Sequence, residues 1–241
     1  MYSEIDQKKE RLDRKRPFPV HTLRSIREHL IINWTYHSNA IEGNTLTLSE
    51  TKVALEGITI GGKTIREHLE AINHKEAILY VEEIVSRREP LTEWHIKNIH
   101  RLVLKGIIDE HAGVYRKENV IIGGAIHIPP DFVQVPNHMQ QLMFEYREWQ
   151  GTRHAVERSA LLHIEFVKIH PFVDGNGRTA RLLLNVELMK NGYPPIVIEK
   201  EDRAEYYAAL DSAHTTGDNL PLFRLIAQKL DLTFDLYLRL V

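Results

Sequence analysis

A twelve-residue segment, HPFVDGNGRTAR at positions 170–181, constrains the fold more than any other part of the chain. It contains a histidine, an aspartate and two glycines, and a largely apolar helical stretch at 182–189 follows it directly. Gly175 and Gly177 let a loop direct successive backbone N–H groups at one anion, and a helix that begins near Asn176 adds the positive end of its dipole. The segment therefore predicts a phosphate site at a helix N-terminus.

The charged side chains of this segment suit a phosphorylated ligand. Arg178 and Arg181 lie three residues apart, so they share one face of the helix and can both reach a polyphosphate. His170 lies just upstream, where it can act on a group that approaches the phosphate, and Asp174 is placed to hold a divalent cation. Each of these features taken alone is more often structural, but their combination in one segment favours the phosphate site.

A zinc site is the alternative for the same residues. His163 lies seven residues before His170, which is two turns of an unbroken helix, and Asp174 could complete a set of three ligands. Zinc would need a further strong ligand and an open position for water, and the Gly-Asn-Gly-Arg sequence would then have no explanation. The phosphate site is therefore favoured.

The composition is that of an ordinary globular protein. The 241 residues, 43% hydrophobic and 27% charged, suffice for one large domain or two small ones. A net charge of −2 gives no broad attraction to nucleic acid or to an anionic membrane, so we expect neither as a partner. The absence of cysteine excludes disulfides and thiolate chemistry. With no apolar run of ~20 residues and no signal-peptide core at the charged N-terminus, we expect a cytoplasmic protein.

Helical periodicity and capping signals predict an almost entirely α-helical fold. Residues 1–19 are rich in charge and end in a Pro-Phe-Pro break, which indicates a short N-terminal helix or arm. Apolar residues at helical spacing predict a helix over 20–40, and capping boxes at Thr47 and Thr64 place further helix starts at the residues that follow them. More helices are expected over 65–86, 93–105, from 136 onward, and over 154–169, 176–190, 201–215 and 220–240.

Residues 113–130 interrupt this helical pattern. The β-branched run at 120–122, the glycine pair at 123–124 and a second apolar run at 126–128 are typical of a β-hairpin. A small hairpin is therefore predicted between two groups of helices.

The segment at 170–181 resembles the signature of the Fic family, His-x-Phe-x-Asp/Glu-Gly-Asn-Gly-Arg-x-x-Arg, and fills every specified position. The segment SNAIEG at 38–43 is similar to the inhibitory motif of the same family. The resemblance covers roughly residue 20 to the C-terminus. It implies an all-α Fic fold, a helical bundle with a small β-hairpin flap over the active site, in which an N-terminal arm at 1–19 precedes a Fic domain with an N-terminal inhibitory helix at 20–241.

The resemblance also implies a reaction, the transfer of AMP from ATP to a Ser, Thr or Tyr hydroxyl of a target protein. In that reaction His170 takes the proton of the hydroxyl, and Asp174 holds Mg²⁺ or Mn²⁺ between the α- and β-phosphates. The phosphates would be held by the backbone and side chains of Gly175, Asn176, Gly177 and Arg178.

Inhibition would involve the second arginine of the signature. In the resembling proteins this residue, here Arg181, holds the γ-phosphate or pairs with the inhibitory glutamate, here Glu42, which shares a helix face with Ser38. We expect a bidentate pair between Arg181 and Glu42, which would keep the γ-phosphate from the position that in-line attack requires. The same glutamate could position a water that removes AMP from a modified target.

Three further expectations follow from the resemblance. The hairpin corresponds to the family's flap, whose free edge pairs with an extended segment of the target; here that edge consists of Val120, Ile121, Ile122 and Gly123. Residues matching the adenine and ribose pocket are Tyr206, Tyr207 and His214. The start of the helix near Ile65 matches a dimer contact, so we expect a homodimer.

Two other classes of function stay open. One is a Fic-fold enzyme with a different donor, because relatives transfer UMP, phosphocholine or a phosphoryl group; the intact Gly-Asn-Gly-Arg-x-x-Arg sequence favours ATP and AMP transfer. The other is a catalytically idle dimeric binding module, against which the presence of His170 and Asp174 argues.

Overall fold

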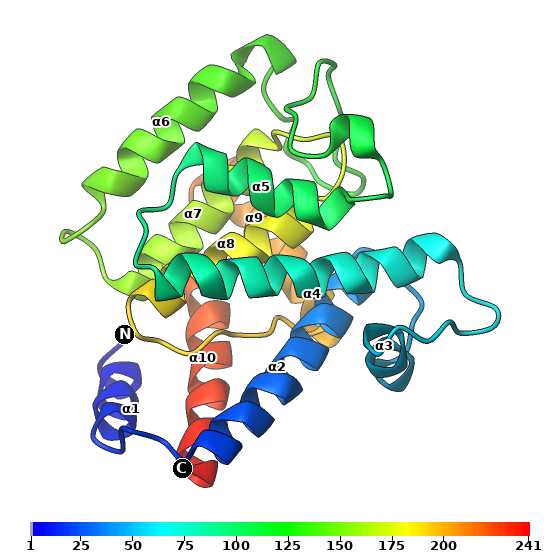
Figure 1. Cartoon of the computed structure of the whole chain (residues 1–241). Helices are drawn as coiled ribbons and strands as arrows, with labels where there is room; N and C mark the ends of the chain where they lie inside the picture. Colours follow the sequence, from blue (N-terminus) through cyan, green and yellow to red (C-terminus); the bar gives the residue numbers. More distant parts are fainter. Residues whose placement is uncertain (1) are drawn as a thin grey trace.

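The chain folds as a bundle of α-helices in a computed structural model that describes residues 2–241 (Figure 1). Helices α7 (Ala155–Ile169) and α8 (Asn176–Lys190) lie at its centre and pack along each other. Most of their side chains are buried, among them Phe166 and Leu184. Because burial of apolar surface is the main driving force of folding, these two helices anchor the loop between them in the hydrophobic core.

The other helices surround this pair. On one face lie α4 (Ile65–Ser86) and α5 (Glu93–Leu104); α2 (Val20–Ile41) and α3 (Leu48–Leu55) pack against α4, and α6 (Val135–Glu148) against α7. Helix α10 (Leu220–Leu240) packs against α7, α9 (Arg203–Thr216) and α1 (Ser3–Asp13). Short 3₁₀ turns occur at Asp109–His111, Phe132–Gln134 and Lys200–Asp202. None of the described helices has the length and apolarity needed to cross a bilayer.

The helix starts predicted from capping boxes are confirmed. The hydroxyls of Thr47 and Thr64 each accept a hydrogen bond at 3.2 Å from the N–H of the glutamate three residues later, and α3 and α4 begin at Leu48 and Ile65. These bonds satisfy N–H groups that have no partner inside the helix. The helix predicted over 201–215 begins later, at Arg203, because the preceding residues form a 3₁₀ turn.

The N-terminal segment contains a helix that docks on the end of the chain. The side chains of Ile5 and Leu12 on α1 are buried in the main core. Lys8 forms ion pairs with Asp231 at 2.7 Å and with Asp235 at 2.5 Å on α10. The first and last helices therefore lie side by side, as Figure 1 shows.

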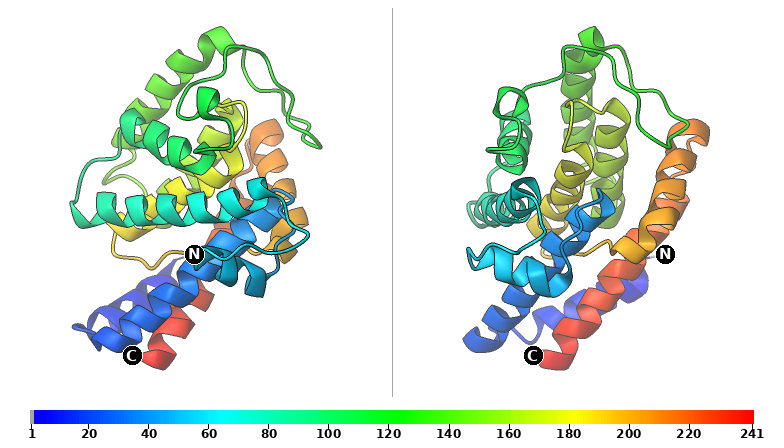
Figure 2. Two further views of the ribbon diagram at one scale, coloured as in Figure 1. Left: turned by 45° about the vertical axis from the view of Figure 1, so that its right-hand side comes forward. Right: turned by 90° about the vertical axis from the view of Figure 1, so that its right-hand side faces the viewer.

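The predicted β-hairpin is not formed. Residues 117–131, which we call the flap loop, contain no strand, and none is found elsewhere in the described chain. A hydrogen bond of 3.2 Å from the Ala125 N–H to the Ile122 carbonyl closes a turn at the tip. Pro129 and Pro130 have no N–H to donate to a ladder, and an isolated pair of strands is marginally stable at best. The flap loop instead extends toward α9 (Figure 2).

Candidate active site

A cavity of about 490 Å³ lies beside the N-terminus of α8. Its walls come from the end of α2, the flap loop, the loop between α7 and α8, and α9. Most of the predicted site residues line it: Glu42, Ile121, Ile122, Gly123, His170, Asp174, Gly175, Asn176, Gly177, Arg181, Tyr206, Tyr207 and His214. Its volume is within the range of small-molecule and cofactor sites.

His170 ends α7 in a left-handed conformation, with φ of 49°. A residue with a side chain rarely adopts this conformation, which here turns the chain sharply out of the helix. Burial lowers the pKa of His170 to about 4, and the nearby charge of Arg116 adds to the shift. The buried Nδ1 has no hydrogen-bond partner among the described residues. The ring is therefore neutral near pH 7, which is the state that a general base requires.

The loop after His170 is fixed by the side chain of Asn176. Its Oδ1 accepts a hydrogen bond of 3.0 Å from the Phe172 N–H, and its Nδ2 donates one of 2.8 Å to the Phe172 carbonyl. The side-chain amide of Asn176 thus holds the backbone of the loop in place. Any contribution of Asn176 to anion binding would come from its own backbone N–H, one of those that the first turn of a helix leaves unpaired.

A second support, His100 on α5, cannot be identified from the sequence pattern. Its Nδ1 accepts a hydrogen bond of 2.9 Å from the Gly113 N–H, so its Nε2 carries the proton and donates to the Asp174 carbonyl at 2.8 Å. The ring stacks on Phe172 at 3.6 Å. Gly175, with φ of 76°, lies so close that a Cβ there would be 3.3 Å from Nε2 of His100. The positive φ therefore favours glycine, and the contact with His100 leaves little room for a Cβ.

Glu42 caps the C-terminal end of α2 and contacts the N-terminal turn of α8. Its Oε1 lies 2.7 Å from Nη2 of Arg181. Nη2 also donates to the Ser38 carbonyl at 2.8 Å, Nε donates to the Ser38 hydroxyl at 3.0 Å, and Nη1 lies 3.5 Å from the Tyr206 hydroxyl. The predicted bidentate pair is therefore not formed, because only Nη2 contacts Glu42, while Nε is bonded to Ser38 and Nη1 faces Tyr206. Burial lowers the pKa of Arg181, but the charges and hydrogen bonds of Glu42 and Tyr206 together outweigh burial and raise the pKa overall.

The carboxylate of Glu42 also lies directly over Gly177. A Cβ at position 177 would be 2.2 Å from Oε1 of Glu42, so only glycine allows this approach. The N-terminal end of a helix attracts anions through its free N–H groups and its dipole. Glu42 therefore lies where a bound phosphate group would be expected.

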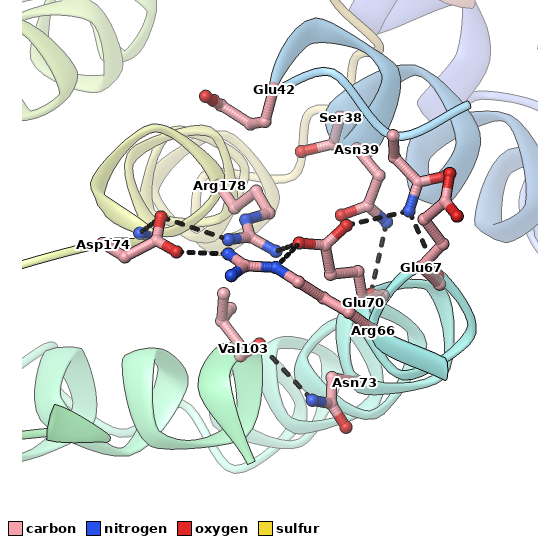
Figure 3. Close-up of polar contacts among 12 residues, drawn as sticks. Ser38, Asn39, Glu42, Arg66, Glu67, Glu70, Asn73, Val103, Asp174 and Arg178 are labelled. Atoms are coloured by element: carbon pink, nitrogen blue, oxygen red, sulfur yellow. Dashed lines mark hydrogen bonds and ion pairs between the residues drawn. The ribbon is translucent and has the colours of Figure 1, made fainter. Parts of the chain in front are cut away.

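Asp174 and Glu70 hold two guanidinium groups between them (Figure 3). Arg66 lies 2.7 Å from Oδ2 of Asp174 and 3.1 Å from Oε1 of Glu70. Arg178 lies 3.4 Å from Oδ1 of Asp174 and 3.4 Å from Oε1 of Glu70. Arg178 is buried in this network and, like Val120 and Ser38, does not line the cavity. Its predicted contact with phosphates stays a prediction.

The ionisation of Asp174 suits a cation. Burial raises the pKa of its carboxyl, but the charges of Arg178 and Arg66 and the Gly175 N–H outweigh burial and hold it below the usual range. No group of three or more candidate metal ligands occurs among the described residues. Magnesium is usually bound by one or two carboxylates together with substrate phosphates, and a single carboxylate on the cavity wall fits that pattern.

The three residues of α9 that are predicted to line the nucleotide pocket each contact a different residue. Tyr206 is buried, which raises its pKa to about 12, and its hydroxyl lies 2.8 Å from Nε2 of His163. The Arg203 guanidinium lies 5.0 Å from the centre of the Tyr207 ring. Nε2 of His214 lies 3.0 Å from the Ile164 carbonyl. Because His163 faces Tyr206, the alternative zinc site with Asp174 is not formed among the described residues.

Comparison with known proteins agrees with the fold. The model of the Fic/DOC family matches residues 90–188. The crystal structure of a Fic domain containing signaling protein from Bacteroides thetaiotaomicron is 30% identical, with a TM-score of 0.89, over 98% of this chain and 96% of that one. Fic-1 from C. elegans is 33% identical, with a TM-score of 0.82, over 98% of this chain and 73% of that one. The chain belongs to the Fic/DOC family.

Within this family the chain is similar to proteins that are named as protein adenylyltransferases. It is 38% identical to the Protein adenylyltransferase Fic of Nematostella vectensis over 99% of its own length and 56% of that protein. The chain spans about half the length of the curated relatives it matches.

Proposed function

We propose that this chain carries the catalytic site of a protein adenylyltransferase, which transfers AMP from ATP to a Ser, Thr or Tyr hydroxyl of a target protein. The observation that carries the proposal is the arrangement within one cavity of a neutral imidazole, an ionised carboxylate and the N-terminus of α8. The name of the similar Nematostella protein supports the same reaction.

The residues of the cavity suit this transfer. His170 accepts the proton of the target hydroxyl while the hydroxyl oxygen forms a bond to the α-phosphorus of ATP. The bond from that phosphorus to the oxygen that bridges the α- and β-phosphates breaks, and pyrophosphate leaves. N–H groups at the start of α8 hold the phosphates. Asp174 would hold Mg²⁺ or Mn²⁺, which neutralises charge on the departing pyrophosphate.

Glu42 keeps this site in an inhibited state. It engages Arg181 at 2.7 Å and lies over Gly177, so the γ-phosphate of ATP cannot reach the same arginine in the productive position. Release of Glu42 would free both the guanidinium of Arg181 and the N-terminal end of α8. The same carboxylate, placed beside the phosphates, could also direct a water that removes AMP from a modified target.

The target binds along the flap loop. Ile121 is 85% exposed, and the flap loop has no ladder of its own. An extended segment of the target pairs with residues 120–123 and completes the strand that the loop lacks, which brings the target hydroxyl toward His170. A second copy of the chain associates through the start of α4, where Ile65 is 79% exposed.

The test compares ATP labelled at the α- or at the γ-phosphate, using the Glu42→Gly variant. Label transferred from the α position alone supports AMP transfer, and label from the γ position indicates phosphorylation. Transfer from UTP or from a choline-containing nucleotide would favour another donor. No transfer from any donor would favour the idle binding module.

A further inference from the structure

Arg116 occupies a central position between the flap loop and the catalytic histidine. Its side chain is only 2% exposed, although it carries a permanent charge. Such a group is costly to bury unless its donors are satisfied. Three of its acceptors are backbone carbonyls that belong to two different parts of the site, and a fourth is Oδ1 of Asn119 at 3.5 Å.

The first part is the turn that contains the catalytic imidazole. Nε of Arg116 donates to the His170 carbonyl at 2.9 Å, and the Arg116 backbone N–H donates to the Pro171 carbonyl, also at 2.9 Å. Two consecutive carbonyls are thus held by one residue. They follow the C-terminus of α7, where carbonyl groups lack helical partners and the dipole attracts a cation. These bonds act on the residue whose backbone adopts the strained left-handed conformation.

The second part is the flap loop itself. Nη1 of Arg116 donates to the Glu118 carbonyl at 2.9 Å, and Nη2 donates to the Pro130 carbonyl. Glu118 lies where the flap loop begins and Pro130 where it ends. In a hairpin, bonds between the two strands would hold these ends together. Here that role falls to a side chain, because the flap loop has no strands.

We propose that Arg116 is a positioning residue that joins the backbone of His170 to both ends of the flap loop, so that the base and the acceptor hydroxyl keep a fixed separation. This inference rests on the function proposed above. Reacting groups must be held in place closely, since a displacement of about 1 Å can lower the rate about 100-fold. A planar guanidinium can reach three carbonyls at once, which the single ammonium group of lysine cannot do in the same geometry.

The chain offers a matched control. Asn119 also ties the ends of the flap loop together, through bonds of 3.1 Å to Asp131 and 2.9 Å from the Phe132 N–H; its Oδ1 lies 3.5 Å from Nη1 of Arg116, but it does not contact His170. A residue that only stabilises the flap loop would behave like Asn119. A residue that links the flap loop to His170 should affect both the flap loop and the turn at His170.

The experiment uses Arg116→Gln, Arg116→Lys and Asn119→Ala, each in the Glu42→Gly background. We expect kcat for AMP transfer to fall at least about tenfold in both Arg116 variants, with nucleotide affinity within about twofold of the parent, since positioning acts on the reaction step. Asn119→Ala should lower kcat less. Equal losses in Arg116→Gln and Asn119→Ala, or a loss confined to nucleotide affinity, would overturn the proposal.

Two readouts do not depend on activity. Amide hydrogen exchange should rise both in the flap loop and at residues 170–172 in the Arg116 variants, but only in the flap loop in Asn119→Ala. NMR titration should show a higher His170 pKa in Arg116→Gln, where the cation is lost, and a retained pKa in Arg116→Lys. The other charges that act on this ring are Glu42, absent from this background, and Asp174.

These readouts test the role of Arg116 separately from the proposed function. If the parent variant transfers no AMP, the proposed function fails, and exchange and titration still decide the role of Arg116. Exchange that rises in the flap loop alone, with an unchanged His170 pKa in Arg116→Gln, would contradict the link. If Arg116→Gln does not fold, Arg116→Lys provides the test. A kcat and an amide exchange equal to those of the parent variant would then contradict the proposal.

Discussion

The carboxylate of Glu42 lies 2.7 Å from the guanidinium of Arg181, although 139 residues separate them in the chain. The contact joins the end of α2 to the first turns of α8, and it places an acid where the positive end of α8 would bind a phosphate. The proposed inhibitory contact and the proposed anion site are therefore parts of one arrangement, and a change in one should affect the other.

Replacing Glu42 by glycine should raise the rate of AMP transfer at least about tenfold, because a charge-assisted contact of about 1.5–3 kcal/mol no longer competes for Arg181. The measurement is incorporation of α-labelled ATP into the protein itself or into lysate. Ser38→Ala is the matched comparison, and it should raise the rate less, since the Ser38 carbonyl still holds Arg181. Equal labelling in the Glu42→Gly variant and the unmodified chain would remove the inhibitory assignment.

Arg66 would compete with the metal ion that we propose at Asp174. It holds Oδ2 at 2.7 Å and its side chain is about half exposed, so the pair is worth up to ~1 kcal/mol. Arg66→Ala should therefore tighten the binding of Mn²⁺ together with a non-hydrolysable ATP analogue by about two- to fivefold, as measured by calorimetry. Arg24→Ala, which removes an exposed arginine paired with Glu28, should leave this affinity unchanged. Weaker binding in Arg66→Ala would mean that Arg66 helps to hold the nucleotide.

Acidification should destabilise the protein well before its carboxylates titrate. Burial lowers the pKa values of four histidines to about 3 or 4; they are His100, His163, His170 and His214. Between pH 6.5 and these values the unfolded chain binds protons that the folded chain does not, so stability falls as the pH falls. Each group contributes a slope of up to about 1.4 kcal/mol per pH unit. Urea midpoints at pH 7.5, 6.5 and 5.5 test this, and a midpoint that stays constant or rises on acidification would contradict it.

Asn176 should matter for stability as well as for the site. Its side chain satisfies the buried N–H and carbonyl of Phe172, and Asn176→Ala leaves both without these bonds. An unsatisfied buried polar group costs about 1–3 kcal/mol, so we expect a loss of about 2–4 kcal/mol in the free energy of unfolding. Asn33→Ala, which removes a solvent-exposed hydrogen bond to the His29 carbonyl, should cost less than about 0.5 kcal/mol. Similar losses in the two variants would show that Asn176 has no special role in fixing the loop.

The sequence predicts those features that depend on residues close together in the chain. The capping boxes at Thr47 and Thr64 involve neighbours three residues apart, and both helix starts are confirmed. The segment at 170–181 contains its own loop and helix start, so the positions of His170 and Asp174 beside the cavity follow from local spacing.

The features that the sequence misses depend on packing between distant elements. His100 supports the Asp174 carbonyl from α5, and Arg66 reaches the Asp174 carboxylate from α4. No pattern near either residue indicates these contacts. The β-hairpin prediction is wrong because β-branched residues favour strands where their side chains pack on neighbours, whereas Ile121 and Ile126 are exposed and Arg116 holds the ends of the flap loop. Arg178 faces Glu70 rather than the cavity for a similar reason, since α4 supplies the carboxylate.

Intact-mass spectrometry of the Glu42→Gly variant after incubation with ATP and Mg²⁺ tests the central claim most directly. We expect a species heavier by one AMP group, which disappears when His170→Ala is added to the same variant. A species heavier by a phosphoryl group, or one AMP group that persists without the imidazole of His170, would contradict the account.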